Sequence, residues 1–185
     1  MRLRSATSTS PIRLGSGGHH SNVTSNETPW IHTVLVSESR FGMMYRMDEC
    51  PVRIGLRIED EFRLDAGAII GGARLLGDRN PLHNDPDAAA RTHFGSLIAC
   101  GPHAAGLHAC MLPTYVTGLG FGVVGVDFTI RYLRPVLPDV DHTMWWTVDD
   151  TEVRGRNWQV SWSGGVEANG ARCIGATGLI LILGP

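Results

Sequence analysis

The sequence predicts one α+β domain in which an antiparallel sheet wraps around a central helix. Two changes in pattern support this: apolar residues recur at helical spacing before Pro113, and they alternate with polar residues after it. The helix expected just before Pro113 carries the small residues Ala104, Ala105, Gly106 and Ala109, which would let a sheet approach its backbone closely. A chain of 185 residues, 43% hydrophobic and 18% charged, is long and apolar enough to bury one core.

The first predicted helix covers about residues 66–76, where Ile69, Ala73 and Leu76 recur at helical spacing. Asp65 is suited to cap its N-terminus, and Gly77 is suited to the left-handed conformation that commonly follows a helix.

A loop is expected over residues 77–86, because Pro81 disfavours the α conformation at Asn80. Asp85 followed by Pro86 is typical of a helix start, and it predicts a short helix through residue 90. The loop is therefore held between two helices.

The central helix is predicted from Gly101 to about Leu112, with Pro102 near its first position. Strands are expected over about residues 124–132, 144–148, 158–162 and 172–183. In the first of these strands Val124, Val126, Phe128, Ile130 and Tyr132 would form the buried face. A turn is expected at residues 154–157, and Asn169-Gly170 predicts a tight hairpin.

Composition excludes several function classes. All 16 basic residues are arginine, so Schiff-base chemistry, a lysine general base and a P-loop are excluded. The formal net charge of −2 predicts no nucleic-acid partner. Cys50, Cys100, Cys110 and Cys173 lie far apart without a CxxC pair, so we expect free thiols in a reducing, cytoplasmic compartment. The longest apolar stretch, residues 179–183, is too short to cross a membrane.

The N-terminal part of the chain differs from the rest. Residues 1–28 are rich in Ser, Thr, Gly and Asn, and they are predicted to be a flexible tail. Their acid-poor, arginine-containing composition also fits a targeting peptide, but Pro11 and several glycines would break the amphipathic helix that such a peptide needs. Residues 29–50 are expected to be an N-terminal extension of uncertain structure, and residues 51–185 to be the folded domain.

Polar functional groups concentrate in the loop, where Asp78 and His83 lie five residues apart with Asn80 between them. A carboxylate and an imidazole in a constrained loop are able to face one water molecule and to exchange protons with it. Asn80 would orient the pair or the substrate. The same residue types are also typical of turns and caps, so a capped connector between two helices explains this spacing equally well.

A resemblance to a known family favours the catalytic interpretation. The chain resembles the MaoC-like dehydratases, also called R-specific enoyl-CoA hydratases or the hydratase 2 group, in Gly77–Asp85, Ala88-Ala89, Phe94-Gly95, Ile98–Gly101 and Tyr132–Val136. The similarity extends over about residues 51–183. It implies a hot-dog fold, an antiparallel sheet curled around one long helix, usually dimerised by joining two sheets edge to edge. A homodimer or a higher homo-oligomer is therefore expected.

Carried over position by position, the resemblance places catalytic roles on Asp78, Asn80 and His83. It also places on Gly101 the backbone N–H that meets the thioester carbonyl, at the positive end of the central helix. The implied reaction is reversible addition of water across the trans-2 double bond of an acyl thioester, which gives the (R)-3-hydroxyacyl thioester. The substrate would be an acyl-CoA or an acyl-carrier-protein thioester, and no cofactor or metal is implied.

Three more residues are predicted to bind the substrate. Arg79 and Arg134 are candidates for the CoA phosphates or for the surface of a carrier protein. Cys100 stands beside the carbonyl site, where many members of the family carry a different residue before the glycine. Pro102 also departs from the common pattern, and it removes one backbone donor.

The same residues also suggest a metal site, a cysteine nucleophile and other functions of an acyl-thioester-binding protein. Cys100, His103, His108 and Cys110 cannot converge on one zinc, because His103 and Cys110 stand about 10 Å apart along the helix axis. A Cys100 nucleophile paired with His103 lacks an acyl-transfer signature. A thioesterase and a non-catalytic acyl-thioester-binding subunit remain as alternative functions, although the complete motif at residues 78–83 favours hydration.

Overall fold

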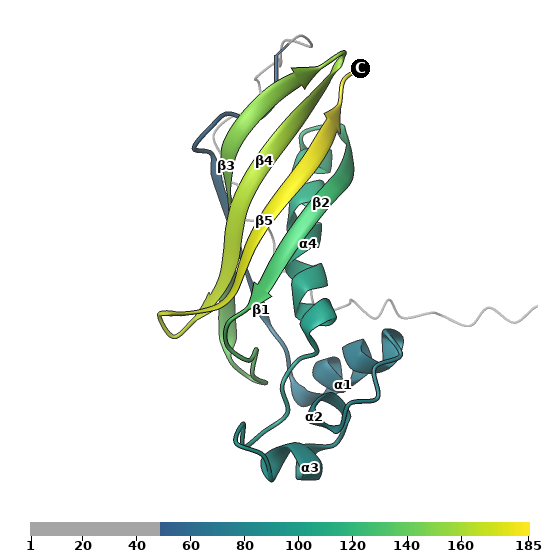
Figure 1. The fold of residues 1–185 in the computed structure, drawn as a ribbon, viewed down its shortest axis with the longest axis vertical. Helices are drawn as coiled ribbons and strands as arrows, with labels where there is room; N and C mark the ends of the chain where they lie inside the picture. The colour runs from purple at the N-terminus through teal and green to yellow at the C-terminus, as the bar shows by residue number, and fades with distance from the viewer. Residues whose placement is uncertain (1–48) are drawn as a thin grey trace, which may run out of the picture.

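The computed structural model describes residues 49–185, which form an antiparallel sheet, one long helix and three short helices (Figure 1). The strands are β1 (Arg57–Arg63), β2 (Gly122–Tyr132), β3 (Asp141–Arg154), β4 (Asn157–Ala168) and β5 (Ala171–Leu183). The helices are α1 (Ala66–Leu75), α2 (Pro81–Asn84), α3 (Pro86–Ala90) and α4 (Gly101–Gly118). The predictions for residues 1–28 and for most of residues 29–50 lie outside the described residues.

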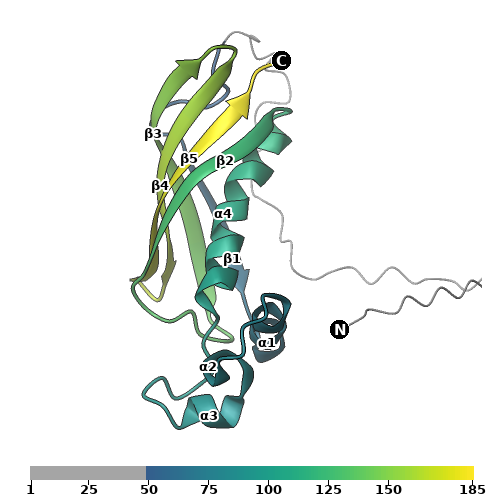
Figure 2. The same cartoon turned by 45° about the vertical axis from the view of Figure 1, so that its right-hand side comes forward.

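The five strands are ordered β1-β3-β4-β5-β2, and each neighbouring pair is antiparallel. Figures 1 and 2 show α4 lying along one face of the curved sheet, with α1, α2 and α3 gathered beyond one end of it. Between α4 and the sheet, Leu112 and Val116 share one buried cluster with Trp146, Trp162 and Ile180. The expected hot-dog fold, an α+β arrangement, is thereby confirmed.

The central helix is longer than predicted. It continues through Pro113 to Gly118, six residues past the expected end at Leu112. Proline cannot donate to the carbonyl one turn back, but the Thr114 hydroxyl donates to the Cys110 carbonyl oxygen at 2.8 Å and satisfies a neighbouring acceptor. Burial of the following turn against the sheet then outweighs the local cost. Neither α4 nor any other helix within residues 49–185 is long and apolar enough to cross a membrane.

Strand β1 was not predicted from the sequence. Five of its seven residues are charged, so the strand shows little of the apolar alternation that identifies a buried strand. It lies at an edge of the sheet, where only Ile58 is buried and Arg63 forms an ion pair with Asp141 of β3 at 3.2 Å. Tertiary pairing with β3 decides its conformation.

The buried face of β2 also differs from the prediction. Phe128 does face the core, where its ring meets Trp146 edge to face at 6.1 Å. Val124 and Val126 are exposed instead, because a β-bulge between Gly125 and Asp127 shifts the alternation. Tyr132, at the end of the strand, is exposed as well. β2 is therefore an edge strand with apolar side chains on its outer surface.

A buried pair attaches α4 to β3. The rings of His108 and Trp146 stack with centroids 4.2 Å apart, and the indole N–H donates to the His108 carbonyl oxygen at 2.9 Å. His108 Nε2 donates in turn to the Trp145 carbonyl oxygen at 3.0 Å. These bonds fix the position of α4 along the sheet, and so they also position the N-terminus of α4.

The local signals around the loop are confirmed. The Asp65 carboxylate caps α1 by accepting from Ala68 N at 2.7 Å, and Gly77 adopts a φ of 72° after the helix. The Asp85 carboxylate caps α3 in the same way. The expected loop, however, contains the helical turn α2, which Asn80 caps in an extended conformation.

Candidate active site

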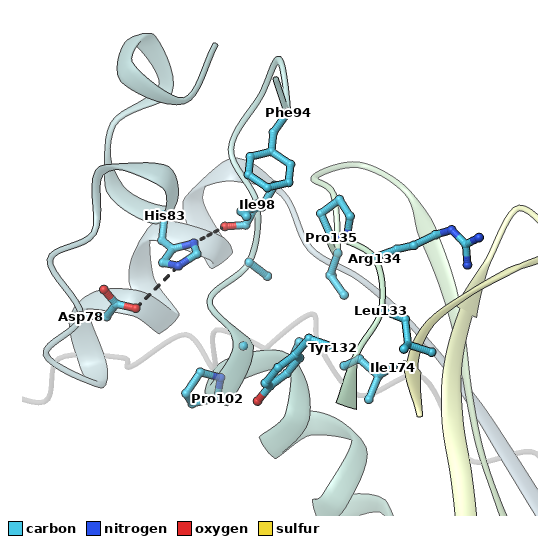
Figure 3. Close-up of a pocket in the computed structure, with 14 residues that line it drawn as sticks. Asp78, His83, Phe94, Ile98, Pro102, Tyr132, Leu133, Arg134, Pro135 and Ile174 are labelled. Atoms are coloured by element: carbon cyan, nitrogen blue, oxygen red, sulfur yellow. Dashed lines mark hydrogen bonds and ion pairs between the residues drawn. The ribbon is translucent and has the colours of Figure 1, made fainter. Parts of the chain in front are cut away.

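A cavity of about 470 Å³ lies where the α2 turn, the N-terminus of α4 and the end of β2 meet (Figure 3). Its lining includes Asp78 and His83 from the motif, Gly101 from the start of α4, and Tyr132 from the end of β2. The structure thus brings together three of the four residues that the sequence predicted to be catalytic, and it adds one that the sequence did not single out.

His83 is held in one orientation and one tautomer. The side chain is 11% exposed, and its Nδ1 lies 2.8 Å from the Ile98 carbonyl oxygen. A carbonyl only accepts, so Nδ1 carries a proton and donates it to this bond. In neutral His83 the lone pair is therefore on Nε2, the nitrogen that faces Asp78. His83 is arranged to accept a proton from a group in the cavity.

Asp78 faces His83 across a short gap (Figure 3). Its Oδ2 lies 3.7 Å from His83 Nε2, which exceeds the 2.7–3.2 Å of a direct hydrogen bond. The other oxygen, Oδ1, accepts from the backbone N–H of Asn80 at 2.8 Å, and this bond fixes the carboxylate plane. One water molecule placed between Oδ2 and Nε2 would find an acceptor for each of its two protons.

The loop that carries Asp78 is clamped by a residue that sequence reasoning missed. The side-chain amide of Asn84 donates to the Asp78 carbonyl oxygen at 2.9 Å and to the Asn80 carbonyl oxygen at 3.0 Å. The Asp78 N–H donates to the Ala73 carbonyl oxygen of α1 at 2.9 Å. Local sequence shows that Asn84 is polar, but not that it closes the loop on itself.

Asn80 supports both neighbours. Its side-chain oxygen caps α2 by accepting from Leu82 N at 3.1 Å, and its Nδ2 lies 3.5 Å from His83 Nε2. It does not line the cavity. Asn80 therefore caps the turn on which His83 is placed.

At the start of α4, one backbone N–H is unpaired. Pro102 has none, and those of His103 and Ala104 both donate to the Cys100 carbonyl oxygen, at 3.1 and 3.2 Å. The N–H of Gly101 has no acceptor among the described residues, and Gly101 lines the cavity. This N–H, at the positive end of an 18-residue helix, is suited to hold a partial negative charge.

Tyr132 packs directly over Gly101. A Cβ placed on Gly101 would lie 2.7 Å from Tyr132 Cζ, the ring carbon that bears the hydroxyl. Partial burial, and secondarily an electrostatic contribution from the neighbouring Cys100, raise the pKa of Tyr132 above its ordinary value. Sequence alternation indicated that Tyr132 belongs to the inner face of its strand, but it could not indicate which backbone the ring would meet.

The three predicted substrate-binding residues are placed differently from one another. Cys100 is fully buried and Arg79 is exposed, and neither lines the cavity. Arg134 lines it, but Figure 3 shows its guanidinium pointing away from Asp78 and His83, and Nη1 donates to the Arg172 carbonyl oxygen at 2.9 Å. Arg134 thus stands at the side of the cavity away from the motif.

Comparison with known proteins identifies the family and the fold. The sequence model of the MaoC-like domain family matches residues 57–166, more than half of the chain. A 3-hydroxybutyryl-CoA dehydratase of Methylorubrum extorquens is 35% identical over 85 residues, which cover 46% of this chain and 53% of the relative. The match thus spans about half the length of that curated relative.

Two solved structures share the fold. An (R)-hydratase from A. caviae involved in PHA biosynthesis is 23% identical with a TM-score of 0.62, over 70% of this chain and 96% of that one. R-hydratase PhaJ1 from Pseudomonas aeruginosa, solved unliganded, is 24% identical with a TM-score of 0.65, over 72% and 84% of the two chains.

Proposed function

The chain belongs to the MaoC-like dehydratase family, and from this premise we propose that it reversibly hydrates a trans-2-enoyl thioester to the (R)-3-hydroxyacyl thioester. One observation carries the proposal: Asp78 Oδ2 and His83 Nε2 lie 3.7 Å apart, in the same cavity as Gly101, whose N–H has no acceptor within residues 49–185. A proton-accepting pair and an oxyanion donor on one small cavity are what addition of water to a conjugated thioester requires.

The water would lie between Asp78 and His83, with one proton directed at each acceptor and a lone pair directed at C3 of the substrate. As the C3–O bond forms, one O–H bond of the water breaks and the proton passes to the pair. The pair then delivers a proton to C2, so the sum of the reaction is addition of H and OH across the double bond. The reverse sequence removes water from the hydroxyacyl thioester.

Between these two steps, electron density moves from the double bond to the thioester oxygen. The Gly101 N–H would hold that oxygen, assisted by the dipole of α4. Removal of one such donor typically costs about 3 kcal/mol of transition-state stabilisation. The fixed start of α4 therefore matters to the rate as much as the acid–base pair does.

The acyl group would be carried by CoA or by an acyl carrier protein. The dehydratase of Methylorubrum extorquens is named for a CoA thioester, and this favours CoA for the present chain. Arg134 at the side of the cavity, and Arg79 on the exposed surface of the loop, are the proposed contacts for the anionic carrier.

We also propose that two copies join along β2. Within residues 49–185 this strand has a neighbouring strand on one side only, and it exposes Val124 and Val126, which is unusual for an edge that stays in water. Light scattering should then give twice the mass of one chain or a higher multiple. A monomer at micromolar concentration would contradict this part of the proposal.

The test of the activity uses trans-2-butenoyl-CoA and the full chain. Loss of the enoyl absorbance without release of thiol, and an (R)-configured product on chiral chromatography, are the expected results. Asp78→Asn and His83→Ala should each lower kcat by ~10²–10⁴-fold with unchanged circular dichroism. Asp87→Asn, which removes an exposed carboxylate from α3, is the matched control and should keep the full rate.

The alternative functions give different outcomes in the same assay. Release of free thiol would identify a thioesterase, and binding of the thioester with no change in either signal would identify a non-catalytic subunit. Full hydration by both Asp78→Asn and His83→Ala would refute the assigned mechanism.

A further inference from the structure

We propose that Tyr132 is a further catalytic residue, whose hydroxyl donates a second hydrogen bond to the thioester carbonyl oxygen beside the Gly101 N–H. This inference rests on the proposed function and deepens it. Neither the sequence motif nor the family resemblance assigned a role to this side chain.

The Tyr132 ring lies at the N-terminus of α4. Tyr132 ends β2, and its ring lies against the first residue of α4, 31 positions earlier in the chain. The atom of the ring nearest to a Gly101 Cβ would be Cζ at 2.7 Å, with Cε1 and Cε2 at 3.0 and 3.1 Å. The phenol end of the ring, rather than its side, therefore stands over the helix N-terminus. Figure 3 shows the Tyr132 hydroxyl directed toward the start of α4.

The start of α4 offers few other hydrogen-bond donors to an oxyanion. An oxyanion is commonly held by two hydrogen bonds, and the second N–H of a helix start is the usual candidate. Here Pro102 occupies that position and has no N–H, while the next two N–H groups already share the Cys100 carbonyl. A second donor to the oxygen held by Gly101 must come from a side chain. Among the described residues that line the cavity, Tyr132 is the one with a hydroxyl.

The Tyr132 hydroxyl is accessible to a ligand in the cavity. The Tyr132 hydroxyl makes no hydrogen bond within residues 49–185, and the side chain is 55% exposed, so a ligand in the cavity is able to reach it. Burial raises the pKa of Tyr132, with a further contribution from Cys100, so the phenol remains protonated at neutral pH. A protonated, unpaired phenol is a donor that needs no rearrangement before it acts.

The ring alone could serve as a wall of the cavity without any role for its oxygen. Tyr132→Phe separates these two possibilities, because phenylalanine keeps the packing over Gly101 and removes only the donor. Tyr115→Phe is the matched control: it removes a hydroxyl from the same helix as Gly101, about 21 Å along the axis at 1.5 Å per residue.

With trans-2-butenoyl-CoA, Tyr132→Phe should lower kcat by ~10²-fold with little change in KM, because the bond strengthens as the oxygen gains charge. Tyr115→Phe should keep kcat within about twofold. A Tyr132→Phe enzyme with the wild-type kcat would overturn the inference while leaving the hydratase assignment intact.

A second measurement does not depend on turnover. A cinnamoyl-CoA chromophore absorbs at longer wavelength when its carbonyl is polarised, so the wild-type protein should shift the spectrum of the bound probe to the red. Tyr132→Phe should lose a large part of that shift at saturating probe, whereas Asp78→Asn should keep it. A third result is a wild-type protein that shifts the spectrum of the probe, with the shift lost in Tyr132→Phe, but that hydrates no enoyl thioester. That result would support the donor role of Tyr132 and refute the hydratase assignment. Absence of a shift in the wild type, or an unchanged shift in Tyr132→Phe, would refute the donor.

Discussion

Gly101→Ala offers the sharpest test of how the helix N-terminus is used. The added Cβ would lie 2.7 Å from Tyr132 Cζ, whereas carbon atoms in contact prefer about 3.5–4.0 Å. The Tyr132 ring must therefore retreat by about 1 Å. A misplacement of this size is able to cost ~10²-fold in rate, so kcat should fall by that order.

Stability should change little in the same variant. Gly101 does not have a positive φ, so alanine fits the backbone, and alanine favours a helix by up to about 1 kcal/mol over glycine. The strain is relieved by movement of a side chain that is half exposed, not by compression of the core. The urea midpoint should thus stay close to that of the wild type while the enzyme loses activity.

Gly106→Ala is the matched control in the same helix. Nothing lies within 4 Å of a Cβ at Gly106, so this change should raise stability by about 0.5–1 kcal/mol and leave kcat unchanged. A double-mutant cycle then assigns the effect to the contact: in a Tyr132→Ala background, Gly101→Ala should cost almost nothing more. Full activity of Gly101→Ala, or additive losses in the cycle, would refute the reasoning from this contact.

The remaining predictions concern the loop and the core. Asn84→Leu removes two hydrogen bonds to the carbonyls of Asp78 and Asn80. The urea midpoint should therefore drop by the equivalent of about 1–2 kcal/mol, and kcat should fall. An unchanged kcat would mean that these two hydrogen bonds are dispensable for activity. Burial lowers the pKa of His108, so below pH ~6.5 the unfolded chain binds a proton that the folded protein excludes. Urea midpoints should therefore fall from pH 7 to pH 5, and less steeply in His108→Gln, which keeps a donor for the Trp145 carbonyl.

Much of the local structure could be predicted because its causes are local. The caps at Asp65 and Asp85, the left-handed Gly77 and the Asn169-Gly170 hairpin depend on neighbours a few residues away, and all four are present. The prediction failed where packing at a distance outweighs a local rule, as in α4 beyond Pro113 and in the charged strand β1.

In the candidate site, too, some features could be predicted from the sequence and others could not. The spacing of Asp78 and His83, together with the family resemblance, was enough to predict a candidate acid–base pair and the glycine at the helix start, and all three residues line one cavity. The same information was not enough to show that the Ile98 carbonyl selects the His83 tautomer or that Asn84 clamps the loop. Hydrogen-bond partners follow from the path of the backbone, and a single sequence does not contain that path.

The sequence by itself determined which chemical groups are present, that no lysine takes part, and that one helix begins at Gly101 without the second N–H that Pro102 removes. Only the tertiary structure decided which side chain lies beside Gly101, where Pro102 provides no N–H. Alternation along a strand reports which face is buried, but not which distant backbone that face meets. The curvature of the sheet around α4 brings the Tyr132 ring onto Gly101, and this contact is the one on which the further test depends.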